Sequence, residues 1–299
     1  MNLFVPPVVG VIVAAIAVWA AVHVTRAGAN PSVRVAHASK PLSSRSSPPT
    51  RAHRASTPAT PQPTGVPGHW KLVLNSTFNG HTLNTNVWRT GWFGSGVTRP
   101  INSHELACYS PGNVTLPGDG SLHLDVTSKA VRCQNDREPY TGAMLTTNPS
   151  DGRPKGGFSF RYGLVQAQVY IPGTGSQIAN WPSVITLGQV WPTDGEDDIL
   201  EGLDGTVCFH FHSPGFAPGG DLGGCDPGFT QGWHIVAADW EPGSVTWYYD
   251  GIEVGHATQG ITSKPMYLVL ADTVSGKARG VIHPSAMRVT YVRVWQHAG

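Results

Sequence analysis

Charged residues are scarce in this chain of 299 amino acids, in which Asp, Glu, Lys and Arg together make up 13%. No long helical pattern of charge occurs, so long surface helices are not expected. Glycine (36), proline (25) and tryptophan (10) are abundant by contrast. This composition is typical of a loop-rich β protein with many turns.

Acidic residues are absent from the chain before Glu105. Beyond residue 104 the net charge is negative, at −8, because this part of the chain contains 11 Lys and Arg and 19 Asp and Glu. An acidic domain repels nucleic acid and sulfated polymers, since phosphate binding needs clustered Lys and Arg. A neutral substrate is therefore expected, and a nucleic-acid partner is not.

Cysteine is limited to four residues, and none of them belongs to a C-x-x-C motif. Zinc knuckles need closely spaced Cys or His pairs, so a metal site is the weakest interpretation. The even number and the moderate gaps favour two disulfides, most simply Cys108 with Cys133 and Cys208 with Cys225. Free buried thiols are the alternative, and no cofactor is predicted.

The N-terminal residues 3–24 carry no charge and are long enough to span a bilayer core of roughly 30 Å. Ala27-Gly28-Ala29 offers a cleavage site, although no Lys or Arg precedes Leu3 as signal peptides require. The basic residues after this segment favour an orientation in which the chain that follows it lies in the cytoplasm. The cysteines and the linker at 30–67 fit export instead. We interpret residues 1–29 as a signal peptide or an N-terminal membrane anchor. The protein is expected to be extracellular or at the cell surface, and membrane-anchored if the segment is not cleaved.

Residues 30–67 consist mainly of Ser, Pro, Thr, Ala and Arg, with almost no large apolar side chain. Such a segment cannot bury enough surface to offset chain entropy, so it is predicted to be a disordered linker. Its positive charge would hold it to an anionic envelope, or it is merely a solvated spacer. The folded domain is expected at 68–299.

Short runs of alternating apolar residues recur between turn clusters from Trp70 onward. Period-two patterning, broken by P-G, D-G and N-G dipeptides, predicts antiparallel strands joined by hairpins. Tyr249-Asp250-Gly251-Ile252 is typical of a hairpin turn. The expected fold is all-β, an antiparallel β-sandwich or jelly roll with a concave substrate groove, and we expect a monomer. The clearest runs lie at 71–74, 121–126, 158–162, 164–171, 245–249 and 287–295.

Six of the nineteen carboxylates lie between Asp194 and Asp204. In a regular strand Glu196 and Asp198 would face one way and Glu201 the other. A β-bulge at Ile199-Leu200 would return Glu201 to the face of the other two. Three carboxyl groups would then line one groove, although like charges packed so closely repel one another.

Two glutamates on one face would lie about 5–6 Å apart at their carboxyl groups, a separation that suits a retaining glycosidase. One would attack the anomeric carbon, and the other would protonate the leaving oxygen and then activate water. Asp198 between them would bind the nucleophile and help to keep the other glutamate protonated. The alternatives are a calcium-binding loop, which spaces its ligands differently and carries an internal Gly, and a solvated acidic turn.

The E-x-D-x-x-E run that follows Gly195 resembles the signature of the family-16 glycoside hydrolases, the laminarinase-like β-glucanases. The resemblance covers nearly all of residues 70–296. Its other elements lie at 70–74, 78–80, 83–84 and 88, in the N-x-x-E-L element at 102–106, in the F-x-x-x-Y-G strand at 158–163, in Trp181-Pro182-Ser183, and at 233–234, 239–240, 247–251 and 289–295.

The resemblance implies a jelly roll and an endo-acting retaining hydrolase, with Glu196 as nucleophile, Asp198 as the assisting carboxylate and Glu201 as acid/base. It also implies that Trp181 stacks on a sugar and that Glu105 binds sugar hydroxyls. A structural calcium is common among relatives, but no signal for one is evident here.

Histidines and tryptophans supply the remaining candidates for substrate binding. His210 and His212 share one strand face, so both would point into the groove, with a structural or a metal role as the alternatives. The apolar face of a pyranose packs on an indole, which makes Trp92, Trp181 and Trp233 candidates. A core or interface position is the alternative for each of these tryptophans.

Four positions depart from the family pattern: Ile185 replaces a second tryptophan, Gln166 and Gln168 replace a charged pair, and Asp197 occupies a position that is usually apolar. An unpaired carboxylate there would be costly. None of them touches the three candidate catalytic carboxyl groups.

The first functional hypothesis is therefore cleavage of β-1,3-glucan or mixed β-1,3/1,4-glucan. The alternatives are a non-catalytic carbohydrate-binding or cell-wall-associated protein on the same fold, or an enzyme of the same family that acts on galactans or by transglycosylation. A third class is an envelope protein that binds anionic polymer through its basic N-terminal arm.

Overall fold

The computed structural model describes residues 59–151, 156–215, 222–276 and 281–298. The signal or anchor predicted at 1–29 and the linker up to residue 58 lie outside these residues. Within the described ranges no helix is long and apolar enough to cross a membrane. The described residues from Pro61 onward belong to one compact unit.

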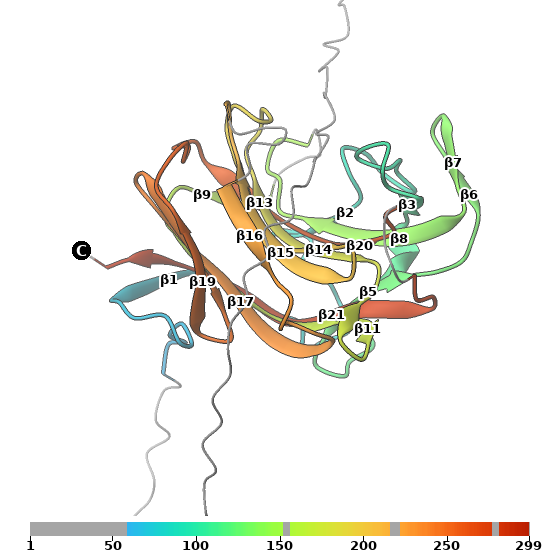
Figure 1. Ribbon diagram of the computed structural model, residues 1–299. Coiled ribbons are helices and arrows are strands. Elements are labelled where there is room, and N and C mark those ends of the chain that lie inside the picture. Colours follow the sequence, from blue (N-terminus) through green and yellow to red (C-terminus); the bar gives the residue numbers. More distant parts are fainter. Residues whose placement is uncertain (1–58, 152–155, 216–221, 277–280, 299) are drawn as a thin grey trace, which may run out of the picture. The chain divides into compact units, whose positions relative to one another are not determined.

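Two sheets packed face to face make up this unit (Figure 1). The first sheet has eight strands, with β1 (Trp70–Thr77) paired to β21 beside the main path. Its main order is β19 (Ile252–Ala257), β18 (Ser244–Tyr249), β17 (Gly232–Glu241), β10 (Gly163–Ile171), β21 (Ser285–His297), β5 (Leu122–Val126) and β4 (Val114–Thr115).

The second sheet has nine strands, with β3 (Ala107–Tyr109) paired to β8 and β9 (Ser159–Phe160) paired to β20. All of its pairings are antiparallel except that of β3 with β8. Its main order is β16 (Leu222–Asp226), β15 (Thr206–His212), β14 (Glu196–Leu203), β13 (Trp181–Leu187), β20 (Met266–Thr273), β8 (Tyr140–Thr146) and β2 (Arg89–Thr90).

Short elements complete the described part of the chain. Two hairpins stand apart from the large sheets: β6 (Val131–Cys133) with β7 (Asp136–Glu138), and β11 (Gly173–Thr174) with β12 (Gln177–Ile178). The helical content of the described residues is one 3-10 turn, η1 (Pro111–Asn113). The predicted all-β sandwich, of jelly-roll type, is therefore confirmed.

Alternation of side chains along the strands builds the core between the two sheets. Val165, Ala167 and Val169 on β10 belong to the same buried cluster as Leu268 and Leu270 on β20. Since successive side chains of a strand point to opposite faces, the residues between these point outward. Each sheet therefore has one outer face, and the two outer faces lie on opposite sides of the sandwich.

The predicted strands match the observed ones, and the predicted hairpin is confirmed. Tyr249 pairs with Ile252 across a two-residue turn in which Asp250 and Gly251 both have positive φ, at 49° and 78°. Both central residues of a type I′ turn need this conformation, which Asp-Gly adopts readily. The run at 158–162 forms a strand only over Ser159–Phe160, because Tyr162 turns to φ 60°.

Both predicted disulfides are confirmed, Cys108 with Cys133 and Cys208 with Cys225. The second joins directly paired residues of β15 and β16.

The boundary predicted between the linker and the domain at residue 67 is wrong, because the preceding residues already belong to the folded unit. Val66 is buried with Trp295 in a cluster on the outer side of the eight-stranded sheet. The backbone of Thr64 exchanges two hydrogen bonds with the Gln166 side chain. Trp295 Nε1 also donates to the carbonyl oxygen of Pro61. Burial of Val66 and these three hydrogen bonds together hold the segment, and composition does not reveal the hydrogen bonds.

Candidate active site

The acidic strand β14 contains the predicted β-bulge. Asp198 pairs with Ile185 of β13 and Leu200 pairs with Val184, so Ile199 has no partner on that strand. On the other side the register with β15 also shifts between Asp198 and Glu201. An extra residue in one strand reverses the alternation of the side chains that follow it. The bulge therefore brings Glu201 to the face that Glu196 and Asp198 occupy.

Residues between these carboxylates point into the core. Ile199 and Leu200 belong to the central apolar cluster, and Asp197 accepts a hydrogen bond of 2.7 Å from Trp247 Nε1. Burial raises the pKa of Asp197 to about 7, against the opposing effect of that hydrogen bond. The departure from the family pattern at Asp197 is thus accommodated by an indole N–H. We call the opposite side, which carries Glu196, Asp198 and Glu201, the carboxylate face.

Each glutamate of the carboxylate face accepts a hydrogen bond from an indole. Trp181 Nε1 lies 3.0 Å from Glu201 Oε1, and Trp191 Nε1 lies 2.6 Å from Glu196 Oε2. Trp181 was predicted from the sequence, whereas Trp191 was not. The available signal was a second Trp-Pro pair, Trp191-Pro192, shortly before Glu196. An N–H that points at a carboxylate stabilises its ionised form and fixes its orientation.

Both predicted histidines also lie on this face, each beside a different carboxylate. His212 Nε2 lies 2.9 Å from Asp198 Oδ2. His210 Nδ1 lies 3.6 Å from Glu201 Oε2. Cross-strand pairing puts both histidines on this face, because His212 is opposite Glu196 and His210 is opposite Asp198. Each histidine then contacts the next carboxylate along β14, on the diagonal.

Charge and burial act against each other at these groups. Burial alone lowers the pKa of His212, but the hydrogen bond to Asp198 and the charges of the carboxylates outweigh this effect and raise the pKa to about 10. Burial and the neighbouring glutamates raise the pKa of Asp198 well above its ordinary range. Both shifts favour the protonated forms, so Asp198 and His212 hold protons beside the glutamates more tightly than they would in water.

Glu196 is subject to two opposing influences. Burial raises the pKa of Glu196, and the charge of Glu201 adds to this effect. The positive charge of His212 and the N–H of Trp191 lower it. Burial prevails and the pKa of Glu196 is raised overall, while the positive charge of His212 and the N–H of Trp191 limit this rise because they stabilise the carboxylate.

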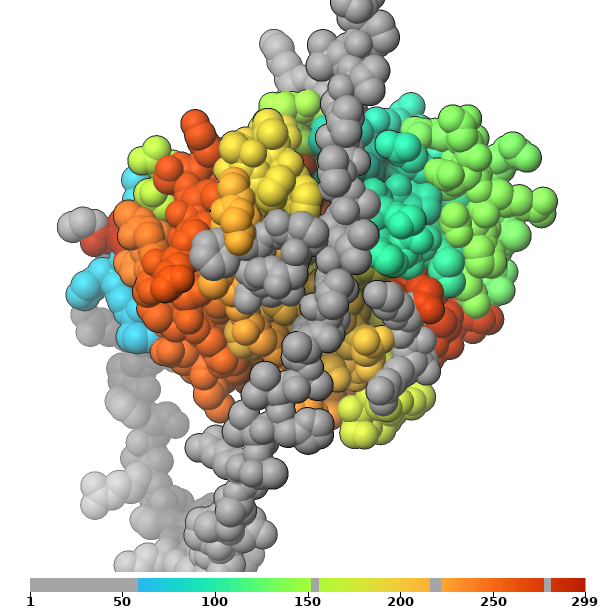
Figure 2. Space-filling view, turned by 45° about the horizontal axis from the view of Figure 1, so that its top comes forward, coloured from blue at the N-terminus to red at the C-terminus, as the bar shows by residue number. Residues whose placement is uncertain are grey.

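An apolar cluster continues the carboxylate face across the nine-stranded sheet. Leu187, Tyr267 and Val269 are buried in it, and Trp92 and Trp191 pack against it. Ile185 also packs there, next to Asp198, so the residue that replaces the family's second tryptophan forms part of this floor. In the space-filling view the yellow segment around the start of β14 and the teal segment between β2 and β3 face the same side (Figure 2).

Glu105 is buried, with 5% of its surface exposed. Its carboxyl group accepts hydrogen bonds from the backbone N–H of Ile101 and the side chain of Asn102. Burial raises the pKa of Glu105 to about 7, although hydrogen bonds from Tyr109 and Ile101 oppose this. Because neighbouring residues already use both carboxyl oxygens, its binding of sugar hydroxyls stays a prediction.

Trp233 is not near the carboxylates, so its predicted place in their groove is wrong. It lies on β17 of the other sheet, opposite Tyr170 of β10, and the neighbouring Val169 and Val236 point into the core. Trp233 therefore lies on the outer face of the eight-stranded sheet. Its sequence context resembles the family pattern, but only the packing of the sheet decides which face of a strand turns inward.

Two groups of three side chains in the described residues offer metal-ligand atoms within 4.8 Å of one another. The first is Asp198, His210 and His212, and the second is Asp239, Glu241 and His297. Calcium prefers oxygen ligands, and the first group supplies one carboxylate beside two imidazoles, so it fits a calcium ion poorly. The imidazole of His212 already binds Asp198, and that of His210 lies beside Glu201.

Comparison with known proteins reveals distant relatives, while no family model matches the chain. A xylanase/beta-glucanase of Ruminococcus flavefaciens is 24% identical over 206 residues, which are 67% of this chain and 23% of that protein. A beta-glucanase of Paenibacillus macerans is 29% identical over 158 residues, which are 51% of this chain and 59% of that protein. The chain thus spans less than two thirds of the length of either relative.

Solved structures share the fold over most of the described chain. The catalytic domain of an endo-1,3-beta-glucanase (laminarinase) from Thermotoga petrophila has a TM-score of 0.65 at 24% identity and covers 78% of this chain and 100% of its own. A non-specific endo-beta-1,3(4)-glucanase from family GH16 has a TM-score of 0.59 at 24% identity, with 79% and 95% covered. The resemblance to the family-16 enzymes is confirmed at the level of the fold.

Proposed function

We propose that this chain is a retaining, endo-acting glycoside hydrolase that cleaves β-1,3 or mixed β-1,3/1,4 linkages in a neutral glucan. The observation that carries the proposal is the bulge in β14, because it brings Glu196 and Glu201 to one face with Asp198 between them. The fold shared with laminarinases supports the same activity. Apart from the substrate and water, both chemical steps use only side chains of the chain itself.

Glu196 is the nucleophile in this proposal. Trp191 and protonated His212 both favour its anionic form. In the first step a carboxylate oxygen of Glu196 bonds to the anomeric carbon while Glu201 donates its proton to the glycosidic oxygen, which leaves as an alcohol. The product is a glycosyl ester of Glu196, with Glu201 left as a carboxylate.

Glu201 then acts as the base. It takes a proton from water, the water oxygen bonds to the anomeric carbon, and the ester bond to Glu196 breaks. The two displacements restore the original anomeric configuration and the starting protonation states. Trp181 holds Glu201 through its N–H and presents an indole beside the cleavage point, where a sugar ring would stack.

Hydrolysis and stereochemistry test this proposal together. The purified protein is offered laminarin, lichenan, agarose and xyloglucan, and NMR follows the first anomer that each reaction releases. We expect laminarin or lichenan to be cut with the β-anomer formed first. Initial release of the α-anomer would contradict the retaining mechanism, and cleavage of agarose alone would favour the galactan alternative.

Variants of the two glutamates test the assigned roles. Glu196→Gln should lower kcat on laminarin by about 10⁴-fold or more while oligosaccharide binding persists. Asp197→Asn is the matched control, because Asp197 is a carboxylate of the same strand that points into the core. Azide should restore turnover in Glu201→Ala with a β-glycosyl azide as product, and in Glu196→Ala with an α-glycosyl azide. Retained turnover of Glu196→Gln would exclude this residue as the nucleophile. Wild-type protein that binds these glucans but cuts none would support the carbohydrate-binding alternative.

The proposed setting is extracellular or at the cell surface, with a polysaccharide as the only partner required. Two disulfides among the described residues support an oxidising compartment. Fractionation of the producing cells, with the protein's mass measured in each fraction, tests both export and retention of residues 1–29. A protein found only in the cytoplasm would contradict this setting.

A further inference from the structure

Four side chains form a straight row across the outer face of the eight-stranded sheet. Trp233 on β17 is paired with Tyr170 on β10, Tyr170 with Arg288 on β21, and Arg288 with His123 on β5. Directly paired residues of neighbouring strands point to the same side of a sheet. Three interstrand steps extend the row over about 14 Å, which is long enough to contact a short oligosaccharide. We call these four residues the aromatic row.

Contacts within the row hold its members in place. The rings of Tyr170 and Trp233 meet edge to face, with their centroids 5.7 Å apart. The guanidinium carbon of Arg288 lies 4.1 Å from the centre of the Tyr170 ring and 5.2 Å from that of Trp233. His123 Nε2 lies 2.8 Å from Asp119 Oδ2. The row is therefore ordered by its own stacking and by one polar contact.

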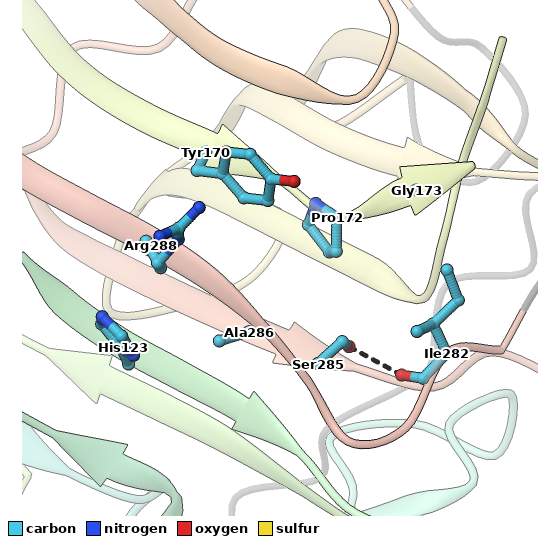
Figure 3. A pocket seen from close by; sticks show the side chains of 8 residues that line it. All are labelled: His123, Tyr170, Pro172, Gly173, Ile282, Ser285, Ala286 and Arg288. Carbon is cyan, nitrogen blue, oxygen red and sulfur yellow. Dashed lines mark hydrogen bonds between the residues drawn. The ribbon is translucent and has the colours of Figure 1, made fainter. Parts of the chain in front are cut away.

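A cavity of about 310 Å³ lies along the row (Figure 3). Tyr170, Arg288 and His123 line it from three neighbouring strands, and Ser285 lies farther along β21 (Figure 3). Trp233 stands beside this cavity with 42% of its surface exposed, although large aromatic residues are seldom left in water. An exposed aromatic surface next to a cavity with a few polar side chains is typical of a binding site.

We propose that the aromatic row is a second carbohydrate-binding site, which holds a neighbouring segment of the same neutral polysaccharide that the carboxylate face acts on. The proposal rests on the proposed function for the identity of the polymer. Trp233 would stack on the apolar face of a sugar ring, and Arg288 and His123 would bind hydroxyl groups. Since the row and the carboxylate face lie on opposite outer faces, the site would tether the polymer without taking part in its cleavage.

The charges around the row favour a neutral ligand. The stacked guanidinium of Arg288 makes no ion pair among the described residues, so its N–H groups can donate to hydroxyls. Asp119 and Asp125 stand on or beside the same face, and they offset the positive charge of Arg288. A polyanion would meet these carboxylates, whereas a glucan hydroxyl can donate to them.

Affinity electrophoresis in gels that contain laminarin tests the site. Trp233→Ala should weaken retention of the protein about three- to tenfold, because one aromatic contact is lost. Ile252→Ala is the control, since Ile252 is an exposed apolar residue of the same sheet, on β19 and outside the aromatic row. Arg288→Gln in the same gels tests the hydroxyl donors. Retention of Trp233→Ala equal to that of Ile252→Ala would overturn the proposal.

Activity separates this site from the proposed active site. Trp233→Ala should cut laminaritetraose with unchanged kcat/KM, because a short substrate fits the carboxylate face alone. If the protein cleaves laminarin but Trp233→Ala does not change its retention, the proposed function is supported and the second binding site is excluded. If retention depends on Trp233 but the protein cleaves none of the glucans, the second binding site is supported and the proposed hydrolase activity is excluded. Light scattering completes the test, since a dimer lost on Trp233→Ala would make this face a self-association surface and overturn the proposal.

Discussion

The hydroxyl oxygen of Tyr249 lies 3.1 Å from the carbonyl oxygen of Ile199 and 3.1 Å from that of Cys208. Ile199 is the bulged residue of β14, and Tyr249 reaches it across the core from β18 of the other sheet. A bulge interrupts the regular hydrogen bonds of a ladder, and buried carbonyl groups need other donors. The irregularity that brings Glu201 beside Glu196 is thus supported from the opposite layer of the sandwich.

Removal of this hydroxyl should loosen the bulge. We expect Tyr249→Phe to lower the free energy of unfolding by about 1–2 kcal/mol, because a buried acceptor loses its donor. The value of kcat should fall several-fold as Glu201 loses its fixed position. Urea denaturation and kinetics on laminarin measure the two effects. Tyr248→Phe on the same strand points the other way and serves as control. An unchanged kcat in a destabilised Tyr249→Phe protein would mean that the bulge persists without this contact.

The indole of Trp191 should control the ionisation of Glu196. Trp191→Phe removes the N–H that lies 2.6 Å from the carboxylate, so the pKa of Glu196 should rise. Since the nucleophile must be ionised, the acidic limb of the pH profile of kcat/KM should move to higher pH by about one unit. Trp92→Phe alters the same apolar cluster without touching a carboxylate and should leave this limb in place. Equal profiles for the two variants would argue against the role of Trp191.

Asp197 should make stability depend on pH. Burial raises its pKa in the folded protein to about 7, above the ordinary value of an unfolded chain. The folded state therefore binds the proton more tightly, and stability is lost as pH rises from about 4 to about 7. Asp197→Asn keeps an oxygen for the Trp247 N–H and should increase the free energy of unfolding by roughly 1–3 kcal/mol at pH 8. The gain should vanish near pH 4, and denaturation at both pH values checks this. A gain of equal size at both pH values would contradict the prediction.

The amide of Gln166 should hold the segment that precedes β1. Its oxygen accepts from Thr64 N at 3.1 Å, and its nitrogen donates to Thr64 O at 2.9 Å. Gln166→Glu keeps the acceptor and loses the donor, so hydrogen exchange at residues 61–66 should accelerate several-fold. Gln168→Glu is the matched control, because the side-chain oxygen of Gln168 accepts from Thr290 and a carboxylate can do the same. Unchanged exchange in Gln166→Glu would show that apolar contacts alone hold the segment.

Local patterns in the sequence were sufficient wherever neighbouring residues decide the structure. The Asp250-Gly251 turn follows from the conformations that these two residues tolerate. The bulge was predicted because three carboxylates of one short run can meet on a single face only if an extra residue interrupts the alternation. The disulfides Cys108–Cys133 and Cys208–Cys225 each join cysteines close in sequence, so the simplest pairing was confirmed.

Tryptophans illustrate what local patterns leave open. Trp181 and Trp233 are both strand residues, yet one binds Glu201 and the other lies on the opposite outer face. A period of two determines which residues of a strand share a face, but not which face turns inward. The hydrogen bond between Trp191 and Glu196 was not predicted for a related reason. Trp191 lies in the turn between β13 and β14, and no periodic pattern of residues predicts the conformation of a turn.

Short-range conformational preferences and residue spacing control the strand content, the turns, the acidic bulge and the choice of cysteine partners, so the amino-acid order alone predicts each of them. The contacts between side chains of different strands depend instead on how the whole chain folds. Packing of the two sheets placed Tyr249 under the bulge, turned Asp197 toward Trp247, and aligned Trp233, Tyr170, Arg288 and His123 across four strands. Register between strands distant in the chain follows from burial of the whole core, which no single segment encodes.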